Sequence, residues 1–311
     1  MSCTDCPRGC ATRGSTSFCG TTTPGRIHWR GVTLLEEHEI SPTYEIYFTG
    51  CSLRCRFCTM SEAIYTPDVG EWLEPTALVA DIASETTPAF RAISFVGGDP
   101  SVNLPYLARL IPLLRQRFPT TRLVYNTNLY FEASLLPDVD IVVGDLHFWR
   151  TDCARRVASA RDYPEVARKA AETLAQRGTP LILRVLALPG HIDCCAAPTA
   201  AWAAMLPGDV SVSVLKNYAP VGRARNHPAL GRGLNADELR RASSLLPQKT
   251  RTPTNTPAPM PRGRHAVDTP APIEIDAAGR VFIPFVTATL LPLVMDLSPD
   301  HACRSAYLDA G

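Results

Sequence analysis

The stretch Tyr44-Glu-Ile-Tyr-Phe-Thr-Gly-Cys51-Ser-Leu-Arg-Cys55-Arg-Phe-Cys58 sets the expectation for the rest of this chain. Residues 44–49 are rich in aromatic and β-branched side chains and predict a strand. Three cysteines with the spacing C-x3-C-x2-C follow it directly. Three thiolates can hold a [4Fe–4S] cluster and leave one iron open to a substrate. Buried thiols, or a zinc site short of one ligand, are the alternative interpretation.

Strand-like and helical segments alternate from the triplet to about residue 218. Apolar stripes predict helices over Leu104–Arg117 and Tyr163–Gln176, and the cap pair Asn235 and Glu238 predicts a third. Such βα units form a parallel sheet, and six right-handed units curl into an open barrel with functional residues at the carboxyl ends of the strands. We therefore expect an α/β fold, a partial (β/α)6 TIM-like barrel with a Cys-rich N-terminal extension and a C-terminal tail. The predicted strands are Glu45–Thr49, Ala92–Val96, Arg122–Asn126, Asp140–Val143, Leu181–Leu188 and Val210–Leu215.

Composition divides the 311 residues into three expected parts. Residues 1–43 form a Cys-rich metal-binding extension, residues 44–250 the barrel, and residues 251–311 a Pro-rich linker with a hairpin and tail. The net charge of +1 gives no indication of nucleic-acid or membrane-surface binding. A secretory leader and an apolar run of about 20 residues are both missing, so we expect a cytoplasmic protein. Clustered cysteines in that compartment favour metal binding or catalysis over disulfides.

The triplet, with Phe57 before its last cysteine, resembles the signature of the radical S-adenosylmethionine (SAM) superfamily. The resemblance implies that SAM chelates the open iron through its amino and carboxylate groups. It also implies reductive cleavage of SAM to a 5′-deoxyadenosyl radical. The stretches 162–168, 188–191 and 217–228, and the N-terminal cysteine pattern, are similar to the pyruvate formate-lyase activating enzyme-like (PflX-type) branch. This resemblance extends over roughly residues 3–245.

The resemblance also points to SAM contacts at several strand ends. Gly97-Gly98-Asp99-Pro100 resembles the GGE motif that contacts the SAM amino group, with an acid one methylene shorter. Asp145-Leu-His147 stands where activating enzymes carry D-x-K, and an imidazole can still donate one hydrogen bond. Loop-capping Asn residues and a structural Arg in the fifth strand are equally compatible with the sequence. The expected SAM-binding residues are Gly97, Gly98, Asp99, Asn126, Asn128, Asp145, His147 and, as a partner of the SAM carboxylate, Arg184.

Two further groups of cysteines carry expectations. Four thiolates within 17 residues suffice for structural Zn²⁺ or for a closed [4Fe–4S] cluster, and their compact spacing favours an auxiliary cluster. This N-terminal quartet is Cys3, Cys6, Cys10 and Cys19. The other four are expected to be small apolar residues in loops. They are Cys153, Cys194, Cys195 and Cys303.

The resemblance predicts that the radical abstracts hydrogen from a small-molecule substrate in a tailoring or biosynthetic reaction. The auxiliary cluster would serve as electron relay or sulfur donor, and a flavodoxin or ferredoxin would supply electrons. One alternative is an activase that makes a glycyl radical on a partner protein; another is a non-catalytic electron carrier. An open-iron triplet beside a SAM-type glycine motif disfavours the carrier. The N-terminal quartet, and His147 in place of Lys, favour a small substrate over a protein.

Overall fold

A computed structural model describes residues 6–10, 18–21, 23–34, 36–60, 66, 69–85 and 89–245, and the backbone of three short strands beyond residue 273. The strands of its main sheet are β1 (Arg26–Thr33), β2 (Thr43–Phe48), β3 (Glu71–Trp72), β4 (Ala92–Gly97), β5 (Arg122–Thr127), β6 (Ile141–Leu146), β7 (Leu181–Leu186) and β8 (Val210–Leu215). The α-helices are α2 (Pro75–Ser84), α3 (Leu104–Arg117), α4 (Thr151–Ala158), α5 (Tyr163–Gln176), α6 (Ala197–Ala203) and α7 (Ala236–Ser243). Short helical turns are η2 (Pro100–Asn103), η3 (Ala133–Leu135), η4 (Ile192–Ala196) and η5 (Gly222–Ala224).

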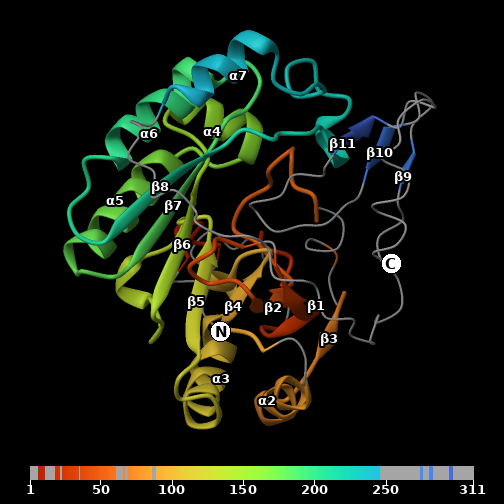
Figure 1. The fold of residues 1–311 in the computed structure, drawn as a ribbon, viewed down its shortest axis with the longest axis vertical. Coiled ribbons are helices and arrows are strands. Elements are labelled where there is room, and N and C mark those ends of the chain that lie inside the picture. The colour runs from red at the N-terminus through yellow and green to blue at the C-terminus, as the bar shows by residue number, and fades with distance from the viewer. Residues whose placement is uncertain are drawn as a thin grey trace.

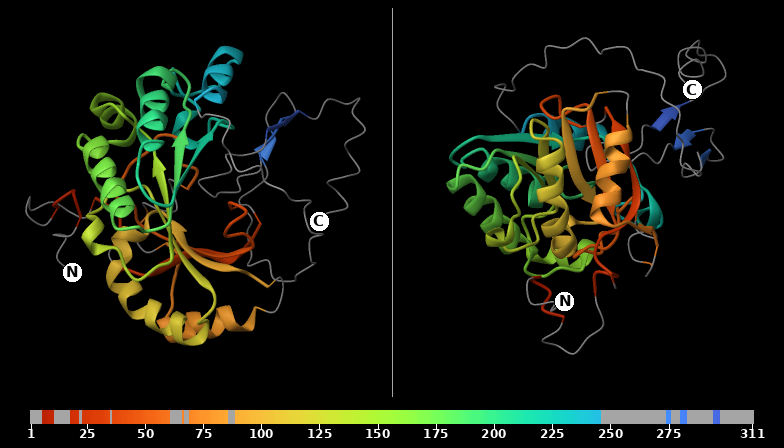
Figure 2. Two further views of the ribbon diagram at one scale, coloured as in Figure 1. Left: turned by 60° about the vertical axis from the view of Figure 1, so that its left-hand side comes forward. Right: turned by 90° about the horizontal axis from the view of Figure 1, so that it is seen from below.

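The main sheet confirms the predicted open barrel. Its strand order is β3-β1-β2-β4-β5-β6-β7-β8, and every neighbouring pair from β2 to β8 is parallel. The sheet bends into an arc with helices on its outer side (Figures 1 and 2). Among the described strands, β3 and β8 are the two edges, so the arc does not close. The carboxyl ends of six parallel strands therefore meet at one rim.

Strand β1 is the main element that the sequence did not predict. It runs antiparallel to β2 and extends the sheet into the region expected to be a separate extension. Only Ile27 of its eight residues is buried, and its register with β2 shifts between Ile27 and Trp29. A half-exposed strand with a bulge lacks the regular alternation that reveals a strand in sequence.

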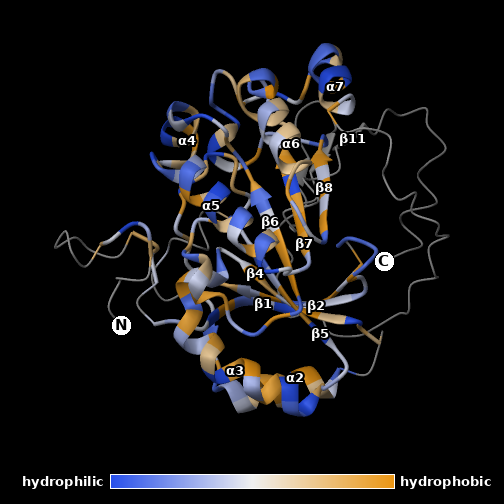
Figure 3. Ribbon diagram, turned by 90° about the vertical axis from the view of Figure 1, so that its left-hand side faces the viewer, coloured by the Kyte–Doolittle hydropathy of each residue, from blue (hydrophilic) through white to orange (hydrophobic). Residues whose placement is uncertain are grey.

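The barrel has an outer and an inner core. Outward-facing aromatic and aliphatic side chains of the strands form one cluster with the apolar stripes of the helices, and Ile46, Phe48 and Leu78 are among its members. Figure 3 shows this pattern, with apolar strands behind helices of mixed hydropathy. The inner face carries a separate apolar cluster. Its members are Ile40, Ala92, Val124, Ile141, Val143 and Ile182. This cluster fills part of the interior and leaves the carboxyl rim to polar residues.

The N-termini of α7 and α5 are held differently. Asn235 and Glu238 form a complete capping box at the start of α7, as expected. Helix α5 begins at Tyr163 as predicted, but Asp162 makes no side-chain cap. Its carboxylate instead accepts the hydroxyl hydrogen bond of Tyr130 at 2.6 Å. A tertiary partner has replaced the local one.

Three strands beyond residue 273 pair with one another. The predicted hairpin segments are β9 (Glu274–Ile275) and β10 (Arg280–Phe282), which pair antiparallel, and β11 (Val294–Asp296) adds to β10. The rest of residues 246–311 lies outside the described part of the chain. No helix in the described part combines the length and apolar character that a membrane span requires.

Candidate radical SAM site

A single cavity at the carboxyl rim of the barrel brings most of the predicted site residues together. The cysteine loop, the glycine turn after β4 and the ends of β5 and β6 all line it. The predicted residues among its lining are Cys51, Cys55, Cys58, Gly97, Gly98, Asp99, Asn126, Asn128, Asp145 and His147. Parallel strands explain the convergence, because their carboxyl ends share one edge.

Two arginines that the sequence analysis did not single out hold the cysteine loop. Arg8 donates from Nε to the carbonyl of Ser52 at 2.8 Å, and Arg223 donates to the carbonyl of Cys55 at 3.2 Å. Burial raises the pKa of the Cys55 thiol, while the charges of Arg223 and Arg8 act in the opposite direction. The two guanidinium groups therefore favour thiolate character in this loop.

The glycine turn is built for close backbone approach. Gly97 has a φ of +108°, and a Cβ atom there would lie 2.5 Å from the nitrogen and oxygen of Phe48. The next residue, Gly98, donates its N–H to the Phe48 carbonyl at 2.9 Å. Only glycine allows the turn to lie this close to the backbone of β2, and both glycines line the cavity.

Asp99 links the glycine turn to the end of β5. Its carboxylate accepts hydrogen bonds from the Ser101 N–H at 2.9 Å, the Thr127 hydroxyl at 3.1 Å and the Asn128 N–H at 2.8 Å. Burial nevertheless raises the pKa of Asp99, although these hydrogen bonds favour the carboxylate. The expected acid of the motif is thus in the cavity wall, and it also holds two neighbouring strand ends together.

The two asparagines after β5 have different surroundings. Asn128 donates from Nδ2 towards the Cys51 sulfur at 3.5 Å, and its Oδ1 accepts the Tyr130 N–H at 2.8 Å. Its amide therefore contacts the cysteine loop and caps its own turn. Asn126 is buried in the cavity wall, and its Nδ2 has no hydrogen-bond partner among the described residues.

The end of β6 presents an acid and a neutral imidazole. Burial raises the pKa of Asp145 to about 7 and lowers that of His147 to about 4. The His147 ring stacks on Tyr163, with centroids 5.9 Å apart, and meets the edge of Phe57. An uncharged imidazole at neutral pH does not replace the positive charge of the Lys in D-x-K.

Three buried polar atoms in this cavity wall test whether a ligand fits. Asn126 Nδ2, Asp145 Oδ1 and His147 Nδ1 all lack a hydrogen-bond partner within the described part of the chain. Leaving such atoms unpaired in a folded protein is costly, so they mark a place for a polar ligand. A molecule with an ammonium group, a carboxylate and a ribose offers both donors and acceptors. The residues present fit SAM.

Comparison with known proteins agrees with this geometry. The model of the radical SAM superfamily matches residues 46–203, about half of the chain. This chain belongs to the radical SAM superfamily. Membership implies an enzyme that uses a [4Fe–4S] cluster and SAM. The matched range holds the triplet, the glycine turn and the ends of β5 and β6.

The individual proteins that resemble this chain are distant. The uncharacterized protein MJ0674 of Methanocaldococcus jannaschii is 25% identical over 219 residues, covering 68% of this chain and 63% of its own length. SuiB of Streptococcus suis bound to precursor peptide SuiA has a TM-score of 0.46 at 14% identity, with 62% of this chain and 42% of that chain covered. TYW1 with a lysine-pyruvate adduct bound has a TM-score of 0.37 at 15% identity, with 49% and 58% covered. The alignment spans less than two thirds of the length of the curated relative.

Arg184 is the one predicted SAM-binding residue that does not line the cavity. Its guanidinium is fully buried in the barrel and pairs with Glu36 and Glu37. The Glu37 bonds are 2.7 Å from Nε and 2.5 Å from Nη2. Burial opposes ionisation of Glu37, but the hydrogen bonds and charge of Arg184 outweigh it and hold the pKa of Glu37 below its usual value. The carboxylates that Arg184 contacts therefore belong to the protein.

Three cysteines of the N-terminal quartet lie in the described part of the chain, and Cys3 lies outside it. Burial raises the pKa of Cys6 to about 11, and repulsion from Cys19 and Cys10 adds to that effect. The carbonyl of Cys19 accepts the N–H of Cys51 at 3.1 Å. The N-terminal cysteines are thus near one another and adjoin the triplet loop.

The residues that sequence reasoning missed are those that act across long separations. Arg8 has a local signal, because it lies between Cys6 and Cys10 of the N-terminal cysteine pattern. Arg223 is 168 positions from the carbonyl that it contacts, and Glu36 is 148 positions from Arg184. Nothing in the neighbouring sequence of Glu36 or Arg223 marks such a partnership.

Proposed function

We propose that the chain is a radical SAM enzyme that abstracts hydrogen from a small-molecule substrate in a tailoring or biosynthetic reaction. Cys51, Cys55 and Cys58 would hold its [4Fe–4S] cluster. The observation that carries the proposal is the cavity that joins this triplet to the glycine turn and to three buried polar atoms, which have no hydrogen-bond partner among the described residues. When bound, the cluster and SAM supply reductive cleavage to a 5′-deoxyadenosyl radical.

The chain's own residues would position SAM and tune the thiolates. The Gly97–Gly98 backbone lets the ligand approach the rim, and Asp145 Oδ1 is an acceptor for an ammonium group. Asn126 Nδ2 is a donor for a carboxylate or ribose oxygen. The N–H···S contact from Asn128 stabilises negative charge on Cys51, which raises the reduction potential of a cluster held there.

The surface supports a small substrate and a charged electron donor. Among the described residues, the exposed large apolar side chains are Leu34 just after β1, Met205 just after α6 and Leu239 on α7. No described helix or strand carries more than one of them, so none presents an apolar face of its own to a partner protein. Arg56 and Arg223 are exposed beside the Cys55 loop. This positive surface suits an acidic electron carrier such as a flavodoxin or ferredoxin.

The proposal also includes the division of the chain into parts and its branch within the radical SAM superfamily. We keep the division into residues 1–43, 44–250 and 251–311, with β1 as the part of the extension that joins the barrel sheet. The quartet would hold an auxiliary [4Fe–4S] cluster. The backbone hydrogen bond from the Cys51 N–H to the Cys19 carbonyl supports a position close to the first cluster. The motifs around 162–168 and 188–191 support the PflX-type branch.

Anaerobic reconstitution with iron, sulfide and SAM tests this proposal. With dithionite as reductant, the wild type should release 5′-deoxyadenosine and methionine. A Cys51→Ala/Cys55→Ala/Cys58→Ala variant should lose about four irons per chain and all deoxyadenosine formation. A matched Cys153→Ala/Cys194→Ala/Cys195→Ala variant, changed at three cysteines that do not line the SAM cavity, should keep both. Undiminished SAM cleavage in the first variant would refute the assignment of the triplet.

Adding candidate substrates separates the two substrate classes. If the substrate is small, a metabolite pool should accelerate deoxyadenosine release. A metabolite in the pool should then lose a hydrogen atom to the deoxyadenosyl radical. A glycyl-radical signal on a co-expressed partner protein, seen by electron paramagnetic resonance, would instead establish the activase.

A further inference from the structure

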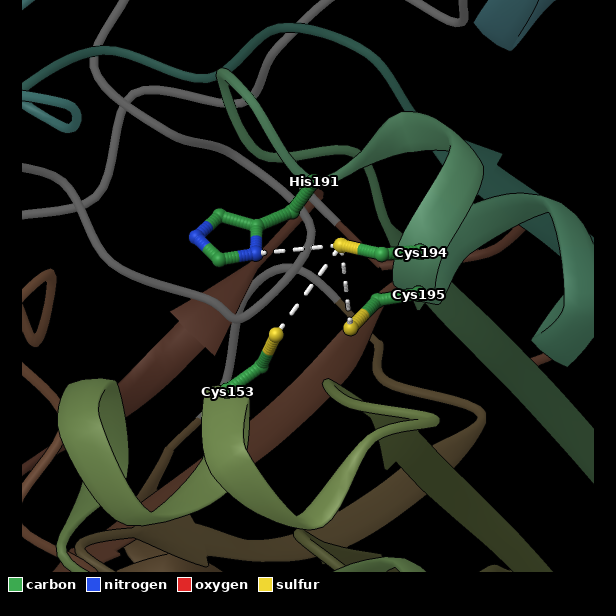
Figure 4. A group of neighbouring side chains, drawn as sticks. All are labelled: Cys153, His191, Cys194 and Cys195. Atoms are coloured by element: carbon green, nitrogen blue, oxygen red, sulfur yellow. Dashed lines mark hydrogen bonds between the residues drawn. The ribbon is translucent and has the colours of Figure 1, made fainter.

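Four metal-ligand side chains gather outside the SAM cavity. They are Cys153 on α4, His191 just before η4, and Cys194 and Cys195 within η4 (Figure 4). Their ligand atoms all lie within 4.8 Å of one another. From the sequence, these cysteines were expected to be small apolar loop residues. Their convergence from two loops of the barrel requires another explanation.

We propose that Cys153, His191, Cys194 and Cys195 form a structural zinc site. A tetrahedral zinc ion with Zn–S bonds of about 2.3 Å and Zn–N bonds of about 2.0 Å has S···S edges of about 3.8 Å and S···N edges of about 3.5 Å. In this structure the Cys194 sulfur lies 3.9 Å from that of Cys153 and 3.8 Å from that of Cys195. It lies 3.5 Å from Nδ1 of His191. Three of the six edges already have the required length.

The same spacing argues against an iron–sulfur cluster here. Each thiolate of a cubane cluster binds a separate iron at a separate corner, so its four protein ligands stand much further apart than the ligands of one ion. Three cysteines and one histidine around a single point are a composition typical of structural zinc. All four positions are filled by protein, which leaves no open position for a substrate.

The backbone explains how adjacent cysteines can face the same point. Strands β6 and β7 are parallel neighbours, so the loops that follow them meet at the rim. Turn η4 is a π-helix, and the carbonyl of His191 accepts the N–H groups of both Cys195 and Ala196 at 3.1 Å. Such wide turns are rare and are concentrated at functional sites. The widened turn brings the sulfur atoms of Cys194 and Cys195 to the side that faces Cys153 (Figure 4).

The surroundings suit a thiolate-rich ion. The backbone N–H groups of Trp149 and Arg150 donate to the Cys195 sulfur, which is the kind of outer contact that orients and stabilises metal thiolates. The positive charge of Arg156 acts on His191 and would offset the net charge of −1 of a zinc ion with three thiolates. Binding would release one proton from each cysteine that enters as a thiol, with no change in oxidation state.

The site would stabilise the rim next to the SAM cavity. Cys153 and Cys195 are buried, whereas His191 and Cys194 are half-buried, which leaves a route for the ion. The ring of Phe148 packs against His191 at 6.5 Å between centroids and against Phe57 of the cysteine loop at 6.3 Å. None of the four ligands lines the SAM cavity. A zinc ion there would tie α4 to η4 behind the wall of the active site.

Metal analysis tests the proposal. Protein is purified under anaerobic, reducing conditions from cells supplied with zinc and iron, and zinc per chain is measured by mass spectrometry. A Cys194→Ala/Cys195→Ala variant should contain about one zinc fewer per chain than the wild type. The Cys51→Ala/Cys55→Ala/Cys58→Ala variant should keep that zinc, so the two proposals can fail separately. Equal zinc in the wild type and the Cys194→Ala/Cys195→Ala variant would overturn the inference.

A second measurement on the wild type avoids dependence on a variant that fails to fold. Cys194 is half-buried and should react with iodoacetamide when free. Peptide mass spectrometry should find it protected in zinc-loaded protein and at least tenfold more reactive after a chelator removes the zinc. Equal reactivity in both samples, or a disulfide between Cys194 and either neighbouring cysteine, would contradict a zinc site.

Discussion

Replacement of Arg184 by Met should destabilise the protein strongly without any direct effect on SAM. The guanidinium makes three hydrogen bonds to Glu36 and Glu37, and the side chains of Arg184, Glu36 and Glu37 are 0%, 0% and 16% exposed. Removing one partner of a buried ion pair costs about 3–5 kcal/mol, because the other charge stays buried and unpaired. We expect the lower end of this range, since Glu37 reaches water.

Urea denaturation of wild type and variant measures the loss in the free energy of unfolding. The matched control is Arg184→Met/Glu36→Gln/Glu37→Gln, which removes the buried charges together and should recover most of the loss. The control should also bind SAM like the wild type. A single variant as stable as the wild type would refute the ion-pair reasoning. Lost SAM affinity in the stable control would restore Arg184 as a ligand of the SAM carboxylate.

The pH dependence of this effect has a definite sign. The pKa of Glu37 is lower in the folded protein than its ordinary value of 4.5, because Arg184 outweighs burial. A lowered carboxyl pKa contributes stability that is present above the unfolded value and lost as pH falls through the folded value. The stability difference between wild type and Arg184→Met should therefore be full at neutral pH and narrow below about pH 4.5.

Three further outcomes follow from the cavity. Gly97→Ala should lower the free energy of unfolding by more than about 2 kcal/mol, because the new Cβ would meet the backbone of Phe48 at 2.5 Å. Gly178→Ala should cost less, because Gly178 has a φ of +73° but open space around its Cβ position. Urea denaturation midpoints compare the two variants. Asn128→Leu should lower the cluster's reduction potential, because the N–H···S hydrogen bond to Cys51 is lost. An anaerobic redox titration measures this potential, and an unchanged value would argue against that hydrogen bond. SAM affinity, measured by equilibrium dialysis, should rise with pH through about 7, because Asp145 ionises and attracts the ammonium group of SAM. Asp145→Asn should flatten this profile.

Local sequence patterns were enough to predict the elements that depend on near neighbours. Helices α3 and α5 and strand β8 have the predicted bounds, and Asn235 caps α7 with Glu238 as expected. These features arise from periodicity and from contacts a few residues apart. Strand β1 was missed because its contacts are with β2 and its exposed face hides the alternation.

The site shows the same division between local and long-range information. The spacing of the triplet and the glycine motif could be read directly, because both are contiguous and each follows a strand. Packing decided which polar atoms of the cavity are left without a hydrogen-bond partner among the described residues. It also decided which polar atoms pair with other protein groups. Arg184 and Asn126 are both polar residues within predicted strands, yet one pairs with Glu36 and the other keeps a free donor, as far as the described residues show.

The sequence alone determined that the chain is an α/β protein of the radical SAM type, because three thiolates at fixed spacing after a strand, followed by a glycine turn, specify one cofactor chemistry. Only the tertiary structure decided the partners of those residues. It assigned Arg184 to buried carboxylates and Asn128 to the Cys51 sulfur. It also brought Cys153 within 3.9 Å of Cys194 across 41 positions. Side chains so far apart in sequence meet only because parallel strands place their following loops on one rim.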